Sequence, residues 1–107
     1  MPKYMVQASY TAAGVQGLLR DSATGRKKAI ETALTALGGA LESIYYCFGD
    51  DDVVIVADLP DNITAASLAI NVAATGLVRI RTTPLLTIEE VDKALGGKVA
   101  YKGPGTA

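Results

Sequence analysis

The stretch IYYCFGDDDVVIVAD, residues 44–58, most strongly limits what this chain can fold into. It is typical of two β-strands, residues 41–48 and 52–58, joined by a turn of glycine and aspartate at residues 49–51. The second strand is apolar at every position from 53–57. Successive side chains of a strand point to opposite faces, so both faces of this strand need a cover. The chain's own helices can cover one face, and we expect a second copy of the protein to cover the other.

The remaining elements follow from hydrophobic periodicity, turn residues and capping signals. A capping box starts at Thr87, because its side chain and that of Glu90 can each accept a hydrogen bond from the other's backbone N–H group. The further elements that we expect are a strand over residues 3–10, a helical turn at 15–19 interrupted near 22–25, a main helix over 26–37, a helix over 63–75 capped by Asp61 or Asn62, a strand over 77–86, and a short helix after Thr87 that Gly96 and Gly97 end.

This order of elements predicts an α+β, ferredoxin-like βαββαβ fold with a short C-terminal helix added. Such a fold has a four-stranded antiparallel sheet with helices on one face, and its first and third strands are central. Pro84 lacks an N–H group, which places the last strand at a sheet edge. Because the third strand is apolar on both faces, we expect a homodimer or larger assembly of the dimeric α+β barrel type, packed sheet to sheet. We assign residues 1–97 to one domain and residues 98–107 to a tail.

The composition excludes several function classes. The chain has no histidine and a single cysteine, Cys47, which excludes nucleophiles activated by histidine, His-ligated metals and an intrachain disulfide. Ten basic and eleven acidic residues give a formal charge of −1, without the clustered basic face that nucleic acid requires. The apolar runs are all shorter than the roughly 18–20 residues of a membrane span. We therefore expect a cytoplasmic protein without a metal, cofactor, nucleic-acid or membrane partner.

Polar side chains on two strands are candidates for ligand binding. Gln7 and Ser9 share one face of the first strand, where they can line a polar pocket or form ordinary interface hydrogen bonds. Arg79 and Arg81 share one face of the last strand. Together they can bind a carboxylate or phosphate, or they can simply form a solvated face.

Three more candidates are a cation and two phenols. Arg26 begins the basic run 26–28 at the start of the main helix, where free N–H groups favour an anion; exposed surface charge is the alternative. Tyr10 and Tyr46 offer hydroxyl groups, and without histidine a tyrosine or arginine would have to handle protons. We assign no catalytic residue. The carboxylates of residues 50–52 diverge along a turn, so a turn is favoured over a divalent-cation site.

The most specific pattern is a series of short segments in a fixed order. They are Lys3-Tyr4, residues 7–11, Gly14-Val15, Gly17-Leu18, Gly25-Arg26, residues 37–39, 48–50, 52–54 and 57–60, and residues 83–87. Together they resemble the GYD domain family over nearly the whole chain. The signature of that family is Gly, a variable residue, Tyr and Asp, and Asp51 stands at the tyrosine position here. The resemblance implies a small ferredoxin-like domain of the dimeric α+β barrel type, and it supplies no activity.

Two functions from different classes fit these observations. The first is a small oligomeric ligand-binding or interaction module, favoured because the chain lacks a nucleophile paired with a base. The alternative is a cofactor-independent monooxygenase or isomerase acting on a small aromatic or anionic substrate. A deep pocket that holds Gln7, Ser9 and a tyrosine would favour the enzyme, and a solid core would favour the module.

Overall fold

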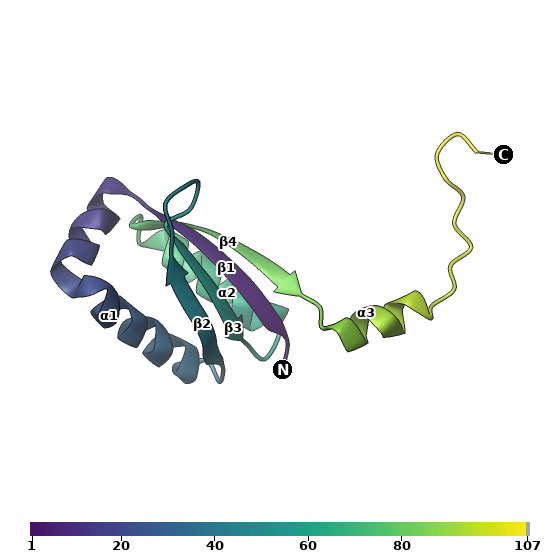
Figure 1. Ribbon diagram of the computed structural model, residues 1–107, viewed down its shortest axis with the longest axis horizontal. Coiled ribbons are helices and arrows are strands. Elements are labelled where there is room, and N and C mark those ends of the chain that lie inside the picture. The colour runs from purple at the N-terminus through teal and green to yellow at the C-terminus, as the bar shows by residue number, and fades with distance from the viewer. Residues whose placement is uncertain (107) are drawn as a thin grey trace.

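The first strand, β1 (Lys3–Tyr10), occupies the residues predicted for it and lies inside the sheet. The computed structural model describes residues 1–106. In chain order the other elements are α1 (Ala12–Ala36), β2 (Ala40–Tyr46), β3 (Val53–Asp58), α2 (Asn62–Ala74), β4 (Val78–Leu85) and α3 (Ile88–Leu95) (Figure 1). The predicted βαββαβ order with a C-terminal helix is therefore confirmed.

The four strands form one antiparallel sheet in the order β2-β3-β1-β4. The two central positions belong to the first and third strands, as predicted. Pro84 lies on the edge strand β4, opposite Tyr4 of β1. The missing N–H group of proline is tolerated there because the outer side of an edge strand has no neighbouring strand to bond. The register also places Gln7 between Val54 of β3 and Arg81 of β4.

Helix α1 is longer than predicted and contains the expected interruption. It begins at Ala12, with Thr11 as its N-cap, and Ser22 within it has a left-handed backbone (φ 71°). The Ser22 hydroxyl accepts a hydrogen bond from the Gly25 N–H group at 3.1 Å, so Ser22 caps the second helical segment. That segment therefore starts soon after Ser22 rather than at Arg26, and the predicted interruption is a kink at Ser22.

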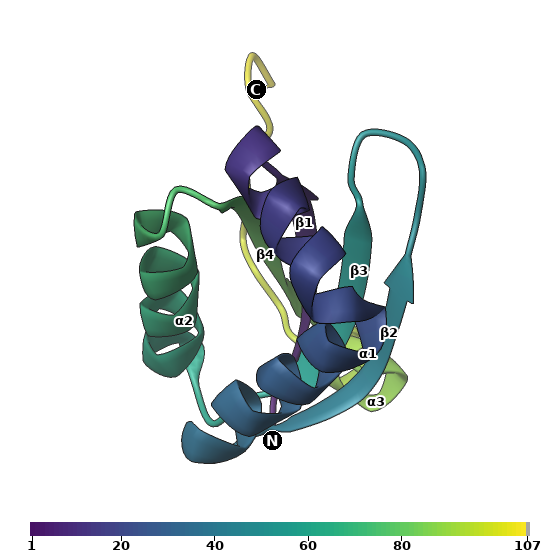
Figure 2. The same cartoon turned by 90° about the vertical axis from the view of Figure 1, so that its left-hand side faces the viewer.

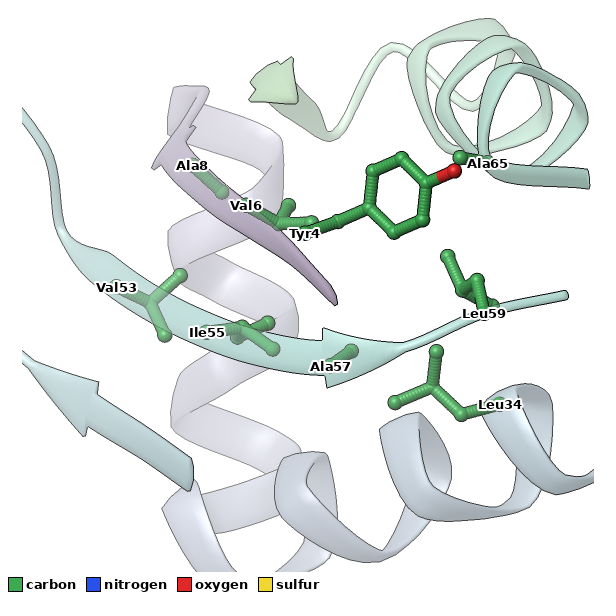
Figure 3. Close-up of a cluster of buried hydrophobic side chains, with 9 residues drawn as sticks. All are labelled: Tyr4, Val6, Ala8, Leu34, Val53, Ile55, Ala57, Leu59 and Ala65. Carbon is green, nitrogen blue, oxygen red and sulfur yellow. The ribbon is translucent and has the colours of Figure 1, made fainter. Parts of the chain in front are cut away.

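The core lies between the sheet and helices α1 and α2, which face the reader in Figure 2. Alternate residues of the two central strands point into it, as Figure 3 shows, together with Leu34 of α1 and Ala65 of α2. The ring of Tyr4 is 1% exposed, and its hydroxyl donates a 2.6 Å hydrogen bond to Oδ1 of Asn62 at the start of α2. The buried residues are Tyr4, Val6, Ala8, Leu34, Val53, Ile55, Ala57, Leu59 and Ala65.

The opposite face of the sheet, which we call the open face, is not covered by a helix of residues 1–106. It carries the alternate residues of the strands, including half-buried Met5, Val54 and Val56 near its centre. Lys3 lies at one end, 2.8 Å from Glu42 and 2.9 Å from Asp58. The described helices do not combine the length and apolar character that crossing a membrane requires.

Candidate functional site

The seven candidate residues lie in two groups on opposite faces of the sheet. Gln7, Ser9, Arg79 and Arg81 lie on the open face, where β1 and β4 pair Gln7 with Arg81 and Ser9 with Arg79. The other three candidates lie on the helix-covered side. A single pocket that combines the two groups is therefore not formed, because the sheet itself separates them.

The open-face group surrounds a hollow of about 470 Å³. Asp51, from the loop between β2 and β3, is part of its lining and contacts two of these side chains, although the sequence did not predict it at this site. Its carboxylate accepts a 2.7 Å ion-paired hydrogen bond from Arg81 and a 3.2 Å hydrogen bond from Gln7. Ser9 donates to the Asp50 carbonyl at 3.0 Å. The hollow is lined by Gln7, Ser9, Asp50, Asp51, Arg79, Ile80 and Arg81.

The three consecutive carboxylates of the loop have different partners. Asp51 points toward Arg81, whereas the Asp52 carboxylate accepts the backbone N–H group of Tyr10 at 2.8 Å. Tyr10 lies beyond the last residue of β1 that pairs with β3, so Asp52 replaces a missing strand partner for that N–H group. Among residues 1–106, groups of three or more acidic or cysteine side chains that could hold a metal ion are absent.

The second group lies at an apolar cavity of about 150 Å³ between the sheet and the two helices. Tyr10 and Arg26 are the polar members of its lining. The Tyr10 hydroxyl is 3.2 Å from that of Tyr46, and Arg26 makes a loose 3.5 Å ion pair with Asp21. The remaining lining is aliphatic: Val6, Ala8, Ala29, Ile30, Ala33, Leu34, Val53, Ile55, Ala57, Leu68, Val72, Val78 and Ile80.

The surroundings of Tyr46 favour its neutral phenol. Partial burial, followed by the hydrogen bond with Tyr10, raises the pKa of Tyr46 well above its ordinary value of 10.0, although the positive charge of Arg26 acts in the opposite direction. Tyr46 therefore stays protonated near neutral pH. Its hydroxyl can take part in hydrogen bonds at the edge of the cavity, but it is a poor general base there.

The sequence model of the GYD domain family matches residues 4–95. The match extends from the second residue of β1 to the last residue of α3, so it covers the sheet apart from Lys3, both core helices and the C-terminal helix. No curated protein and no solved structure matches the chain. On the strength of the family match, this chain belongs to the GYD domain family.

Proposed function

We propose that this protein is a self-associating module that binds a small ligand in the apolar cavity between α1, α2 and the sheet. The observation that carries the proposal is the lining of that cavity, which is aliphatic except for Tyr10 and Arg26. Ligand sites in proteins commonly combine an apolar wall with a few polar groups that orient the ligand. A cavity in this place also means that the helices do not fill the core completely.

The size and the polar groups of the cavity indicate the ligand class. A volume of about 150 Å³ suits one aromatic ring or a short branched acyl chain, since an engineered apolar cavity of similar size binds benzene. Arg26 can pair with a carboxylate, and its own ion pair with Asp21 is long enough, at 3.5 Å, to be exchanged for a ligand. The Tyr10 hydroxyl can donate a hydrogen bond to the same head group. A small aromatic or branched carboxylic acid combines these features.

Benzoate is a suitable probe, and benzyl alcohol is its neutral counterpart. We expect benzoate to shift the amide resonances of residues around the cavity in a nuclear magnetic resonance titration. Arg26→Ala should weaken benzoate binding about tenfold, because a charge-assisted hydrogen bond is lost, and should change benzyl alcohol binding little. Lys27→Ala is the matched control, because Lys27 is the next cation along α1 and is not part of the cavity lining.

A filling variant tests the cavity itself. Ala33 lines the cavity from α1 and is exposed, so Ala33→Phe can place a ring in the cavity without disturbing the buried core. We expect this variant to remain folded and to lose both probes. If the wild-type protein bound neither probe, or if Ala33→Phe bound both unchanged, the cavity would not be the ligand site.

The enzyme alternative receives less support from the geometry. It requires Gln7 and Ser9 in one pocket with a tyrosine, but both residues lie on the open face, whereas Tyr10 lines the cavity on the other face. The raised pKa of Tyr46 also argues against a phenolate base near neutral pH. Binding therefore fits the arrangement of these residues better than monooxygenase or isomerase chemistry does.

Self-association is proposed through the open face. Met5, Val54 and Val56 give its centre an apolar character, and ion-paired side chains lie at its two ends. Packing two such faces together would remove this apolar area from water in both copies. Light scattering on a size-exclusion column should give twice the chain mass of 11.1 kDa, and a monomer at all accessible concentrations would contradict this part of the proposal.

A further inference from the structure

Helix α3 has an apolar side that the rest of its own chain leaves exposed. Ile88 is 79% exposed and Leu95 is 73% exposed, and Val91 lies on the same side of the helix. Figure 1 shows α3 beyond the end of β4, and within residues 1–106 it makes no extensive contact with another element. The radius of gyration is 17.3 Å, against about 13 Å for a compact chain of this length.

An isolated helix as short as α3 is not expected to be stable in water. It has eight residues, and isolated helices below about 12–15 residues are marginal. The capping box between Thr87 and Glu90 is formed, with hydrogen bonds of 2.9 and 3.1 Å, so the sequence does specify a helix here. The family match also extends to Leu95 and includes α3. A helix that is specified locally but lacks internal packing needs a surface to pack against.

The charges on α3 argue against a membrane surface and for the open face of the sheet. Glu89, Glu90 and Asp92 outnumber the one cation, Lys93, and an acidic helix is repelled by anionic lipid. On the open face, Arg79 has no ion-pair partner among residues 1–106, and the side chain of Arg81 is 64% exposed. The carboxylates of α3 can thus pair with Arg79, whereas Arg81 already has Asp51 as its ion-pair partner.

We propose that α3 is an exchanged arm: in a homodimer, the apolar side of each α3 packs on the open face of the other copy, along the edge of β4 that carries Arg79 and Arg81. A second copy of the chain carries both an exposed α3 and an open face. In a two-fold symmetric dimer, each α3 therefore covers the open face of the other copy. Leu86 and Thr87 are the only residues between β4 and α3, which directs α3 past the end of its own sheet. The inference rests on the proposed self-association and not on ligand binding in the cavity.

Hydrogen–deuterium exchange of the α3 backbone amides, measured over a dilution series, tests whether α3 packs on the other copy or elsewhere. We expect these amides to be protected where light scattering reports a dimer, and to lose protection together with the dimer on dilution. Protection that does not change with dilution would mean that α3 folds back on its own domain. Protection that appears only when zwitterionic lipid vesicles are added to the monomer would indicate a membrane surface. Either outcome would overturn the proposal.

Two glutamate substitutions on opposite sides of α3 form a matched pair. Leu95→Glu places a charge in the apolar contact, and we expect it to raise the dimer dissociation constant at least about tenfold, since each dimer buries two such residues. Lys93→Glu introduces the same residue on the other side of the helix and should change the constant by no more than about twofold. If the two variants changed the dissociation constant equally, or if Leu95→Glu did not change it, the proposal that α3 is an exchanged arm would be wrong.

A substitution on the open face separates failure of the arm from failure of self-association. Val56→Glu places a charge at the centre of that face, and we expect a folded monomer with unprotected α3 amides. If Val56→Glu gives a monomer while Leu95→Glu leaves the dimer unchanged, the sheets associate and the arm is wrong. If Val56→Glu leaves a dimer with protected α3, then α3 does not pack on the open face.

Discussion

The guanidinium group of Arg81 lies 2.7 Å from the carboxylate of Asp51, which connects the edge strand β4 to the loop between β2 and β3. The contact passes over β1, where Gln7 also donates a hydrogen bond to Asp51. The side chain of Asp51 is 13% exposed, whereas that of Arg81 is 64% exposed. Asp51 therefore attaches the loop between β2 and β3 to the edge strand β4 by an ion pair.

The contribution of this ion pair can be measured with a double-mutant cycle. Arg81→Ala should lower the free energy of unfolding by about 0.5 kcal/mol, because an exposed cation gains little from pairing. Asp51→Ala should lower it by about 1–2 kcal/mol, because Gln7 and Arg81 both lose their acceptor. We expect a coupling energy of about 0.5 kcal/mol from urea unfolding of the four proteins. Additive effects would mean that the pair has no net stabilising role.

Two glycines of α1 should respond in opposite directions to the same substitution. A Cβ atom at Gly14 would collide with the carbonyl oxygen of Leu77, whereas a Cβ atom at Gly17 would meet open space. Gly14→Ala should therefore lower the free energy of unfolding by about 1–3 kcal/mol. Gly17→Ala should raise it by about 0.5–1 kcal/mol, because alanine is the better helix former. Thermal unfolding of both variants is the measurement, and a stable Gly14→Ala protein would mean that α1 does not approach Leu77 so closely.

The pKa of Tyr46 predicts how the stability of the fold changes at alkaline pH. Because burial raises this pKa above 10.0 in the folded state, the unfolded chain loses the phenol proton first as the pH rises. The associated stability is fully present below pH 10 and is lost as the pH rises through the folded-state pKa. Tyr46→Phe should therefore make the decline of the free energy of unfolding above pH 10 less steep.

An ultraviolet absorbance titration of the tyrosines checks the same assignment. Tyr46→Phe should remove the most alkaline transition of the folded protein. Tyr45→Phe removes an exposed phenol from the neighbouring position of β2 and should leave that transition in place. If Tyr46→Phe left the most alkaline transition unchanged, another tyrosine would be responsible for it.

The hydroxyl of Tyr4 should contribute to stability independently of its ring. Tyr4→Phe keeps the buried ring and removes the 2.6 Å hydrogen bond to Asn62. We expect a loss of about 1 kcal/mol in the free energy of unfolding, because the exposed Asn62 can turn to water instead. Asn62→Ala should cost more, about 1–3 kcal/mol, because it leaves the buried Tyr4 hydroxyl without an acceptor, and the double variant should cost less than the sum. Calorimetry of the three variants measures these values, and full additivity would show that the two side chains act separately.

Local signals in the sequence predicted the elements and their order well. Alternation identified β1, the capping box identified α3, and Pro84 correctly placed β4 at an edge. These signals act between residues that are close in the chain, which explains why they can be recognised without a structure. The start of α1 was predicted less well, because the first segment begins at Ala12 with Thr11 as its cap rather than at Val15, whereas the predicted interruption is present as a kink at Ser22.

The sequence by itself therefore determined the elements, the βαββαβ order and the candidate polar residues. Only the tertiary structure decided which of those residues meet. Arg81 is 30 positions from Asp51, and Tyr10 is 36 positions from Tyr46, so periodicity carries no information about either contact. Their separation into two sites follows from the sheet, since successive residues of one strand point to opposite faces. Gln7 and Tyr10, three residues apart, thus belong to different sites because the pleat of β1 directs them to opposite sides.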